Sequence, residues 1–113
     1  MAHFLIIEPN EDIRRLYAAV IRGLGHDAAF INGGSMADPE VVLVEPADPE
    51  SFAAALRLQR DNPALPVICA SVHKPSQHID LLEACTHLLK PFSLVELSDA
   101  LQLALSQSDL LSV

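Results

Sequence analysis

Glu8, Glu45, Ser71 and Lys90 are the side chains with which this sequence could do chemistry, because each ends or follows a short apolar run. The two glutamates stand in matching phrases, since "FLIIEP" and "VVLVEP" both close an apolar run with Glu-Pro. In open parallel α/β sheets, ligands and reactive groups gather beyond the carboxyl ends of the strands. If these runs are parallel strands, topology alone brings two carboxylates, a hydroxyl and a lysine together.

The apolar runs are continuous rather than alternating, which is typical of parallel strands covered on both faces. The segments between them have helical periodicity or are broken by Gly and Pro. The predicted strands are residues 3–8, 27–32, 41–45, 66–71 and 86–89. The predicted helices are residues 11–24, 49–61, about 76–85, and the segment that follows Ser93.

Capping residues mark where three of these helices begin. Asn10 and Asp48 precede helices as N-caps, and Pro49 takes a first helical position. Ser93 and Glu96 form a capping box ahead of the last helix. The stripes expected to face the sheet are Ile13, Leu16, Tyr17, Val20, Ile21 and Leu24 in the first helix, Phe52, Ala55, Leu56 and Gln59 in the second, and Leu94, Leu97, Leu101, Ala104 and Leu105 in the last.

Strands that alternate with helical segments predict an α/β fold, with a parallel sheet and helices on both faces. The stretch from Gly25 to Glu45 is short for such a unit. Its "GGSMADPE" segment can form no more than a turn of helix. The second helix is therefore expected to be truncated or missing, which would leave an exposed apolar patch for a partner to cover.

The composition limits the classes of function. A length of 113 residues suits one domain, and a net charge of −8 argues against nucleic acid as a direct partner. No apolar run reaches the roughly 20 residues that span a bilayer, and the N-terminus lacks a basic signal region. We expect a cytoplasmic protein with no membrane contact. Cys69 and Cys85 stand in apolar surroundings, so we expect buried thiols rather than a disulfide, and their spacing does not suit a metal site.

The sequence resembles a receiver domain of the bacterial two-component response regulators. The phrase "LLKPFSLVEL" matches the last strand and helix, "LIIEPNEDIRRL" the first pair, "VVLVEP" the third strand and "PVICAS" the fourth. The likeness covers residues 3–106, and residues 107–113 are expected to be a tail. It implies a flavodoxin-like, doubly wound (βα)5 fold with strand order 2-1-3-4-5, and a role in phosphorelay signal transduction.

The resemblance also implies roles for individual residues. Lys90 corresponds to the lysine that pairs with the phosphoryl group, and Ser71 to the switch hydroxyl. Glu8 takes the first place of the acidic pair, and Glu45 the place of the phosphoacceptor aspartate. His87 stands where many receivers have a switching aromatic residue. The resemblance further implies that the Lys90–Pro91 peptide bond is cis.

Two departures from the family pattern concern the acids. Pro9 occupies the second acidic place, which removes a Mg²⁺ ligand. Glu45 is one methylene longer than the usual aspartate. We therefore expect no bound Mg²⁺ and no ordinary aspartyl phosphorylation. Glu45 could bias the domain toward an active-like state, or simply pair with Lys90; we favour pairing, because a carboxylate copies a phosphoryl group poorly.

His87 and the overall function also leave alternatives. Histidine can respond to pH near neutrality, but we favour a half-exposed His87 without a regulatory role. The leading hypothesis is an interaction module with no catalytic residue, which contacts a histidine kinase, an output domain or a second copy through its last helix and strand. One alternative is a working phosphoreceiver that uses Glu45 or Asp48. The other is a small ligand binder using Gly33 and Gly34.

Overall fold

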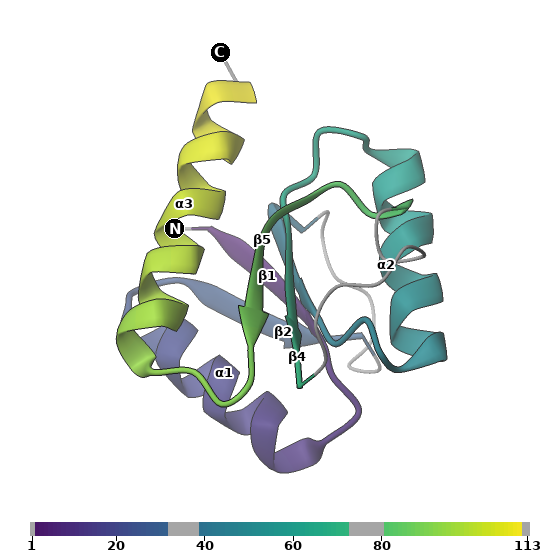
Figure 1. The fold of residues 1–113 in the computed structure, drawn as a ribbon. Helices are drawn as coiled ribbons and strands as arrows, with labels where there is room; N and C mark the ends of the chain where they lie inside the picture. Colours follow the sequence, from purple (N-terminus) through teal and green to yellow (C-terminus); the bar gives the residue numbers. More distant parts are fainter. Residues whose placement is uncertain (1, 32–38, 73–80, 112–113) are drawn as a thin grey trace.

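The computed structural model describes residues 2–31, 39–72 and 81–111 of the chain (Figure 1). Most of the loop expected at 33–40, the pair Gly33-Gly34 and the first half of the helix expected at about 76–85 lie outside these residues. The described elements are β1 (His3–Ile7), α1 (Glu11–Gly23), β2 (Asp27–Phe30), β3 (Val41–Val44), α2 (Pro49–Asp61), β4 (Val67–Ser71), β5 (Ala84–Leu89) and α3 (Leu94–Leu111).

The five strands form one parallel sheet in the order β2-β1-β3-β4-β5. This confirms the predicted doubly wound topology. Helices α1 and α3 cover one face and α2 covers the other (Figure 1). The strand β3 is wholly buried between the layers, which explains its unbroken apolar sequence "VVLV". None of the described helices is long and apolar enough to cross a membrane.

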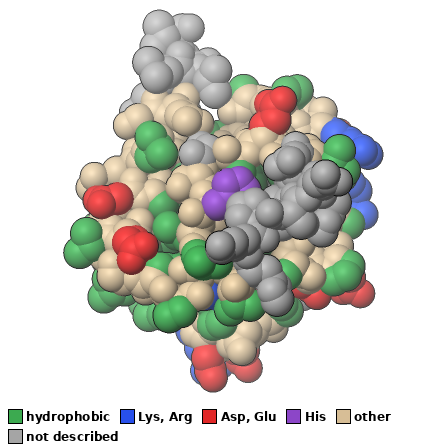
Figure 2. Space-filling model, in the orientation of Figure 1, with side chains coloured by type: hydrophobic (Ala, Val, Ile, Leu, Met, Phe, Trp, Pro, Cys, Tyr) green, Lys and Arg blue, Asp and Glu red, His purple; other side chains and the backbone are tan. Residues whose placement is uncertain are grey.

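The two faces of the sheet have separate aliphatic cores. Beneath α1 and α3, the core is built on Phe4, Ile6, Leu43 and Ile68 of the strands. Beneath α2, small side chains bring the helix close to the sheet, and Ala54 and Ala55 are both buried. Figure 2 shows Lys and Arg side chains mainly at the edge next to α2, whereas Asp and Glu are spread widely.

The predicted caps are present. The Asn10 side chain accepts a hydrogen bond from the Ile13 amide at 3.1 Å, and Asp48 accepts one from the Ser51 amide at 3.0 Å. Ser93 and Glu96 exchange two reciprocal bonds of 3.1 Å, which complete the capping box of α3. These contacts satisfy amide groups at the starts of the helices, and so fix where each helix leaves the carboxyl end of its preceding strand.

Three leucines that were expected to face the sheet are exposed instead. Leu16 and Leu24 of α1 lie outside the core because the buried face of this helix is centred on Tyr17, Ala18 and Ile21. Leu94 is exposed because it belongs to the first turn of α3, before the buried residues from Leu97 onward. The stripes drawn from periodicity were therefore too wide.

Two element boundaries also differ from expectation. Ala84 and Cys85 belong to β5, so the helix expected before this strand cannot extend to Cys85. The cause is a backbone hydrogen bond from Ala84 N to Leu82 O, 3.0 Å long, followed at once by pairing with β4. At the other end of the chain, α3 continues to Leu111, past the boundary expected at residue 106.

Candidate functional site

The carboxyl ends of β1, β3, β4 and β5 bring together the residues that the sequence singled out. Glu8 directly follows β1, Glu45 follows β3, Ser71 ends β4 and Lys90 follows β5. Because these four strands are successive neighbours in the sheet, residues up to 82 positions apart meet at one edge. We refer to Glu8, Glu45 and Lys90 as the charged cluster.

Lys90 binds Glu8 more closely than Glu45. Its Nζ donates a hydrogen bond to Glu8 Oε1 at 2.7 Å. The other oxygen, Oε2, accepts a bond from the Asn10 amide at 3.1 Å. Both carboxylate oxygens of Glu8 are therefore engaged, and its side chain is only 3% exposed. A charge-assisted bond of this length in a buried place is among the stronger polar contacts of a protein.

Glu45 makes the weaker contact within the charged cluster. Its Oε1 lies 3.6 Å from Lys90 Nζ, which is an ion-pair distance but longer than a hydrogen bond. Its Oε2 is buried and has no hydrogen-bond partner among the described residues. The side chains of Glu45 and Lys90 are only 12% and 13% exposed, so little water is available to solvate their charges. The expected pairing of these residues thus takes the form of a long contact, and Glu8 takes the short one.

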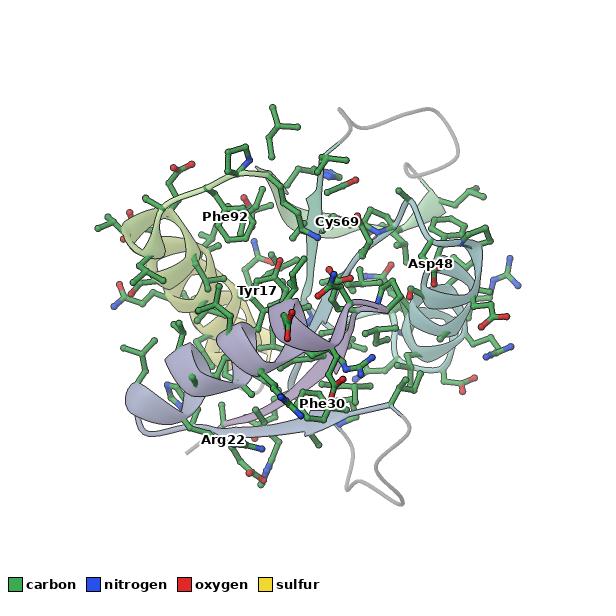
Figure 3. The ribbon with its side chains drawn as sticks, turned by 90° about the horizontal axis from the view of Figure 1, so that it is seen from below. Tyr17, Arg22, Phe30, Asp48, Cys69 and Phe92 are labelled. Atoms are coloured by element: carbon green, nitrogen blue, oxygen red, sulfur yellow. The ribbon has the colours of Figure 1, made fainter. Side chains whose placement is uncertain are left out.

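Tyr17 is a fourth member of this region that sequence reasoning did not assign to the site. Burial, and then the negative charges of Glu8 and Glu45, raise the pKa of its hydroxyl above the ordinary value near 10. The hydroxyl is buried and has no partner in the described part of the chain. Its ring is stacked on Phe92, with centroids 6.2 Å apart (Figure 3).

Two signals in the sequence pointed toward Tyr17. It is the single tyrosine of the chain, and it stands on the inward stripe of the first helix. The first turns of such a helix lie close to the strand end that precedes it. Arg14, also missed, holds the same strand end from outside, because its Nη1 donates to the carbonyl oxygens of Glu8 and Pro9 at 3.0 and 3.3 Å.

Ser71 and Lys90 are linked through the main chain. The Lys90 amide donates a 2.7 Å hydrogen bond to the Ser71 carbonyl oxygen, which extends the β4–β5 ladder by one bond. Ser71 is buried. The peptide bond between Lys90 and Pro91 is cis. The position of the lysine is thus set by the sheet on one side and by the turn into α3 on the other.

The remaining candidates, His87 and Asp48, stand apart from the charged cluster. His87 lies on β5 opposite Cys69, and it is exposed. The Asp48 carboxylate serves as the cap of α2, since its Oδ2 accepts bonds from both the amide and the hydroxyl of Ser51, at 3.0 and 2.6 Å. Among the described residues, the ion pairs of Lys90 are to Glu8 and Glu45 and do not include Asp48.

The charged cluster contains two carboxylates and one ammonium group, and all three side chains have little exposure to solvent. An uncompensated charge there would be costly, so Lys90 is required by both acids. The arrangement can join β1, β3 and β5 electrostatically. Among the residues that the structure describes, one carboxylate oxygen of Glu45 and the Tyr17 hydroxyl have no hydrogen-bond partner at this edge of the sheet.

No family model matches the sequence, and no curated protein matches it. Solved structures match over nearly the whole chain. The N-terminal domain of a response regulator/sensory box/GGDEF 3-domain protein from Carboxydothermus hydrogenoformans gives a TM-score of 0.80 at 18% identity, covering 98% of this chain and 99% of that one. A CheY-like response regulator receiver domain protein from Methanospirillum hungatei gives 0.78 at 12% identity, covering 96% and 97%.

NtrX from Brucella abortus, crystallised in complex with ADP, gives a TM-score of 0.77 at 22% identity. The match covers 96% of this chain but 27% of that one, so the chain spans about a quarter of the NtrX chain. These neighbours confirm that the chain has the flavodoxin-like fold of response regulator receiver domains, the fold to which "LLKPFSLVEL" pointed.

Proposed function

We propose that this chain is a receiver-like signalling module that works through protein contacts and does not undergo Mg²⁺-dependent phosphorylation. The observation that carries the proposal is the 2.7 Å bond between Lys90 Nζ and Glu8 Oε1. In the receiver pattern, this lysine pairs with the phosphoryl group. Here a carboxylate of the chain already holds it, and Glu45 stands at the phosphoacceptor place.

The donor set also suits Mg²⁺ poorly. This ion demands near-octahedral oxygen geometry and is usually bound by carboxylates with free oxygens. Both oxygens of Glu8 are engaged, and Pro9 offers no carboxylate in the second acidic place. No group of three or more metal-ligating His, Cys, Asp or Glu residues occurs in the described ranges. The site is therefore proposed to keep its lysine without a metal.

Phosphorylation with a small donor tests this proposal. The protein is incubated with acetyl phosphate and Mg²⁺ beside a receiver that has the usual aspartate, and both are weighed by intact mass spectrometry. We expect a phosphoryl mass gain in the reference alone. A gain in this chain that disappears in Glu45→Gln would instead support a phosphoreceiver at Glu45. A mass gain that disappears in Asp48→Asn would identify Asp48 as the phosphoacceptor instead.

The contact surface proposed for this module is the exposed side of β5 and the first turns of α3. Leu89, Leu94 and Val95 are exposed there, the last two by 62% and 69%. Figure 2 shows separate hydrophobic side chains on this side of the molecule, with Asp or Glu groups between them and few Lys or Arg groups. Solvent-facing leucine and valine side chains near one another in sequence favour an apolar contact. We propose a second copy of the chain as the occupant.

Sedimentation tests this contact. A dimer of the wild-type protein is expected to dissociate in the variant Leu94→Gln/Val95→Gln. The matched control is Leu16→Gln, because Leu16 is also exposed, by 51%, but lies on α1. A monomer at all concentrations, or an equal effect of the control, would contradict the dimer. A histidine kinase or an output domain remains the predicted heterologous partner, and a cytoplasmic location remains a prediction.

A further inference from the structure

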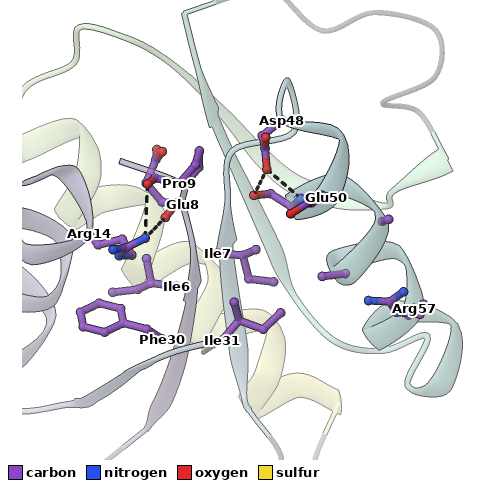
Figure 4. A pocket seen from close by; sticks show the side chains of 13 residues that line it. Ile6, Ile7, Glu8, Pro9, Arg14, Phe30, Ile31, Asp48, Glu50 and Arg57 are labelled. Atoms are coloured by element: carbon purple, nitrogen blue, oxygen red, sulfur yellow. Dashed lines mark hydrogen bonds between the residues drawn. The ribbon is translucent and has the colours of Figure 1, made fainter. Parts of the chain in front are cut away.

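A pocket of about 670 Å³ opens beside the charged cluster, between α1, the end of β2 and α2 (Figure 4). This volume lies within the roughly 300–1,000 Å³ typical of small-molecule sites. The apolar part of its wall comes from Ile7, Phe30, Ile31 and Ala54. It occupies the flank of the sheet where the sequence predicted thin cover. The function proposed above makes no use of it.

Two arginines reach this pocket from different helices. Arg14 extends from α1 and places its guanidinium 5.8 Å from the centre of the Phe30 ring. Arg57 extends from α2, and Figure 4 shows it on the opposite side. Neither guanidinium forms an ion pair with a carboxylate among the described residues. Arg14 is held by carbonyl oxygens, which do not neutralise its charge.

Three acids also line the pocket, and two of them already have partners within the chain. Glu8 is paired with Lys90, and Asp48 accepts both of its hydrogen bonds from Ser51 at the start of α2. The positive end of that helix further stabilises Asp48. The third acid, Glu50, is exposed. Hydrogen bonds leave the charge of Asp48 in place, as they do that of Arg14, so by formal charge the pocket sets two arginines against Asp48 and Glu50. The Asp48 carboxylate is turned to Ser51, whereas Arg57 has no ion pair among the described residues and can accept a single carboxylate of a ligand. Several negative charges on a ligand would be repelled by the two acids.

From these charges and this wall, we infer that the pocket binds a small organic monoanion, a carboxylate with a flat or branched apolar body. The carboxylate pairs with the Arg57 guanidinium, whose planar fork matches it. The apolar body lies against Phe30 and Ile31. This site is independent of the function proposed for the charged cluster, and a phosphorylation result leaves it unaffected.

Titration by amide NMR tests the inference, with benzoate as the probe. Benzyl alcohol is the neutral probe of similar shape, and inorganic phosphate is an anion without an apolar body. Benzoate is expected to shift the amides of Phe30, Ile31 and Arg57 saturably, whereas the other two probes do so at least about threefold more weakly. No saturable shift at these amides, or equal binding of benzyl alcohol, would overturn the inference.

Substitutions on the exposed side of α2 provide a second test of the inferred site. Arg57→Gln is expected to weaken benzoate binding by about threefold to tenfold, and Glu50→Gln to tighten it by about twofold. Arg60→Gln is the matched control, because Arg60 is exposed on the same helix but lines a different hollow. Equal weakening by Arg57→Gln and Arg60→Gln would show a general charge effect, and would also overturn the site.

Discussion

The two Glu-Pro strand ends have the same sequence and different environments. After β1, the chain turns so that the amide two residues beyond Glu8, that of Asn10, donates back to the carboxylate. After β3, the Glu45 amide bonds to Ile7 O at 3.0 Å, but within the described ranges the Glu45 Oε2 atom has no such partner. Glu8 therefore has a donor for each oxygen, whereas Glu45 depends on a 3.6 Å contact with Lys90.

This difference shows which glutamate supports the fold. Glu8 is bound as a structural ion whose removal leaves a lysine and an amide without their acceptor. Glu45 occupies the central place of the site, yet the part of the chain that the structure describes contacts only one of its carboxylate oxygens, at 3.6 Å from Lys90 Nζ. A buried charge without full compensation costs stability. The comparison thus predicts that Glu8 supports the fold more strongly than Glu45 does.

Removing the shared cation should have the largest effect. Lys90→Met leaves both carboxylates buried without an opposite charge, so we expect the free energy of unfolding to fall by about 3–5 kcal/mol. Urea denaturation measures the change. The control is Arg15→Gln, which breaks the exposed Arg15–Glu11 pair of 2.7 Å and should cost less than about 0.5 kcal/mol.

A double-mutant cycle separates charge from packing in this result. If the loss comes from unpaired acids, adding Glu8→Gln to Lys90→Met should recover part of the stability, because one buried charge is removed. No recovery would mean that Lys90 acts mainly through its aliphatic stem. In that case the charged cluster would not be the feature that joins these strand ends.

The second prediction compares the two glutamates directly. Glu8→Gln weakens a charge-assisted bond to Lys90, so we expect it to cost about 1.5–3 kcal/mol. Glu45→Gln loses only the long contact and removes a poorly compensated charge, so the change should stay within about 1 kcal/mol. Chemical denaturation of both variants, under one set of conditions, gives the ranking. Equal costs, or a larger cost for Glu45→Gln, would reverse the assignment made above.

The sequence predicted the gathering of these residues because the strand ends follow from the alternation of apolar runs and helices, while the resemblance to receiver domains implied the strand order. The caps at Asn10 and Asp48 were also predictable, since they depend on local residue types. The partner of Lys90 was not predictable. Whether its ammonium group meets Glu8 at 2.7 Å or Glu45 at the same distance depends on the turn after each strand, and both turns begin with the same Glu-Pro pair.

Tyr17 and the exposed leucines show a second limit of the sequence. Periodicity placed Leu16 and Tyr17 on one stripe. A small rotation of the helix about its own axis, however, decides which of the two is buried. The structure buries Tyr17 and exposes Leu16. Small residues such as Ala18 set that rotation, because they allow close approach to the sheet. Apolar patterning counts large residues and so misses this effect.

The smallest predicted effect concerns Tyr17, which lies close to both glutamates. Because the pKa of its hydroxyl is raised in the folded state, the folded protein keeps this proton above pH 10 while the unfolded chain releases it. The folded state then binds more protons, so the free energy of unfolding falls as pH rises above the ordinary tyrosine pKa near 10. One proton corresponds to a slope of at most about 1.4 kcal/mol per pH unit.

The variant Tyr17→Phe isolates this slope from the titration of lysines, which both proteins share. We expect the wild-type protein to lose stability relative to the variant above pH 10, and the two curves to run parallel below it. Because Tyr17 is the single tyrosine of the chain, the near-ultraviolet tyrosinate band should also appear only at higher pH than in a free tyrosine, or on unfolding. Ionisation at the ordinary pH in the folded protein would mean that the hydroxyl is solvated and distant from Glu8 and Glu45.

Introducing Glu45→Gln should move the onset of the tyrosinate band to lower pH, since one of the two repelling charges is then gone.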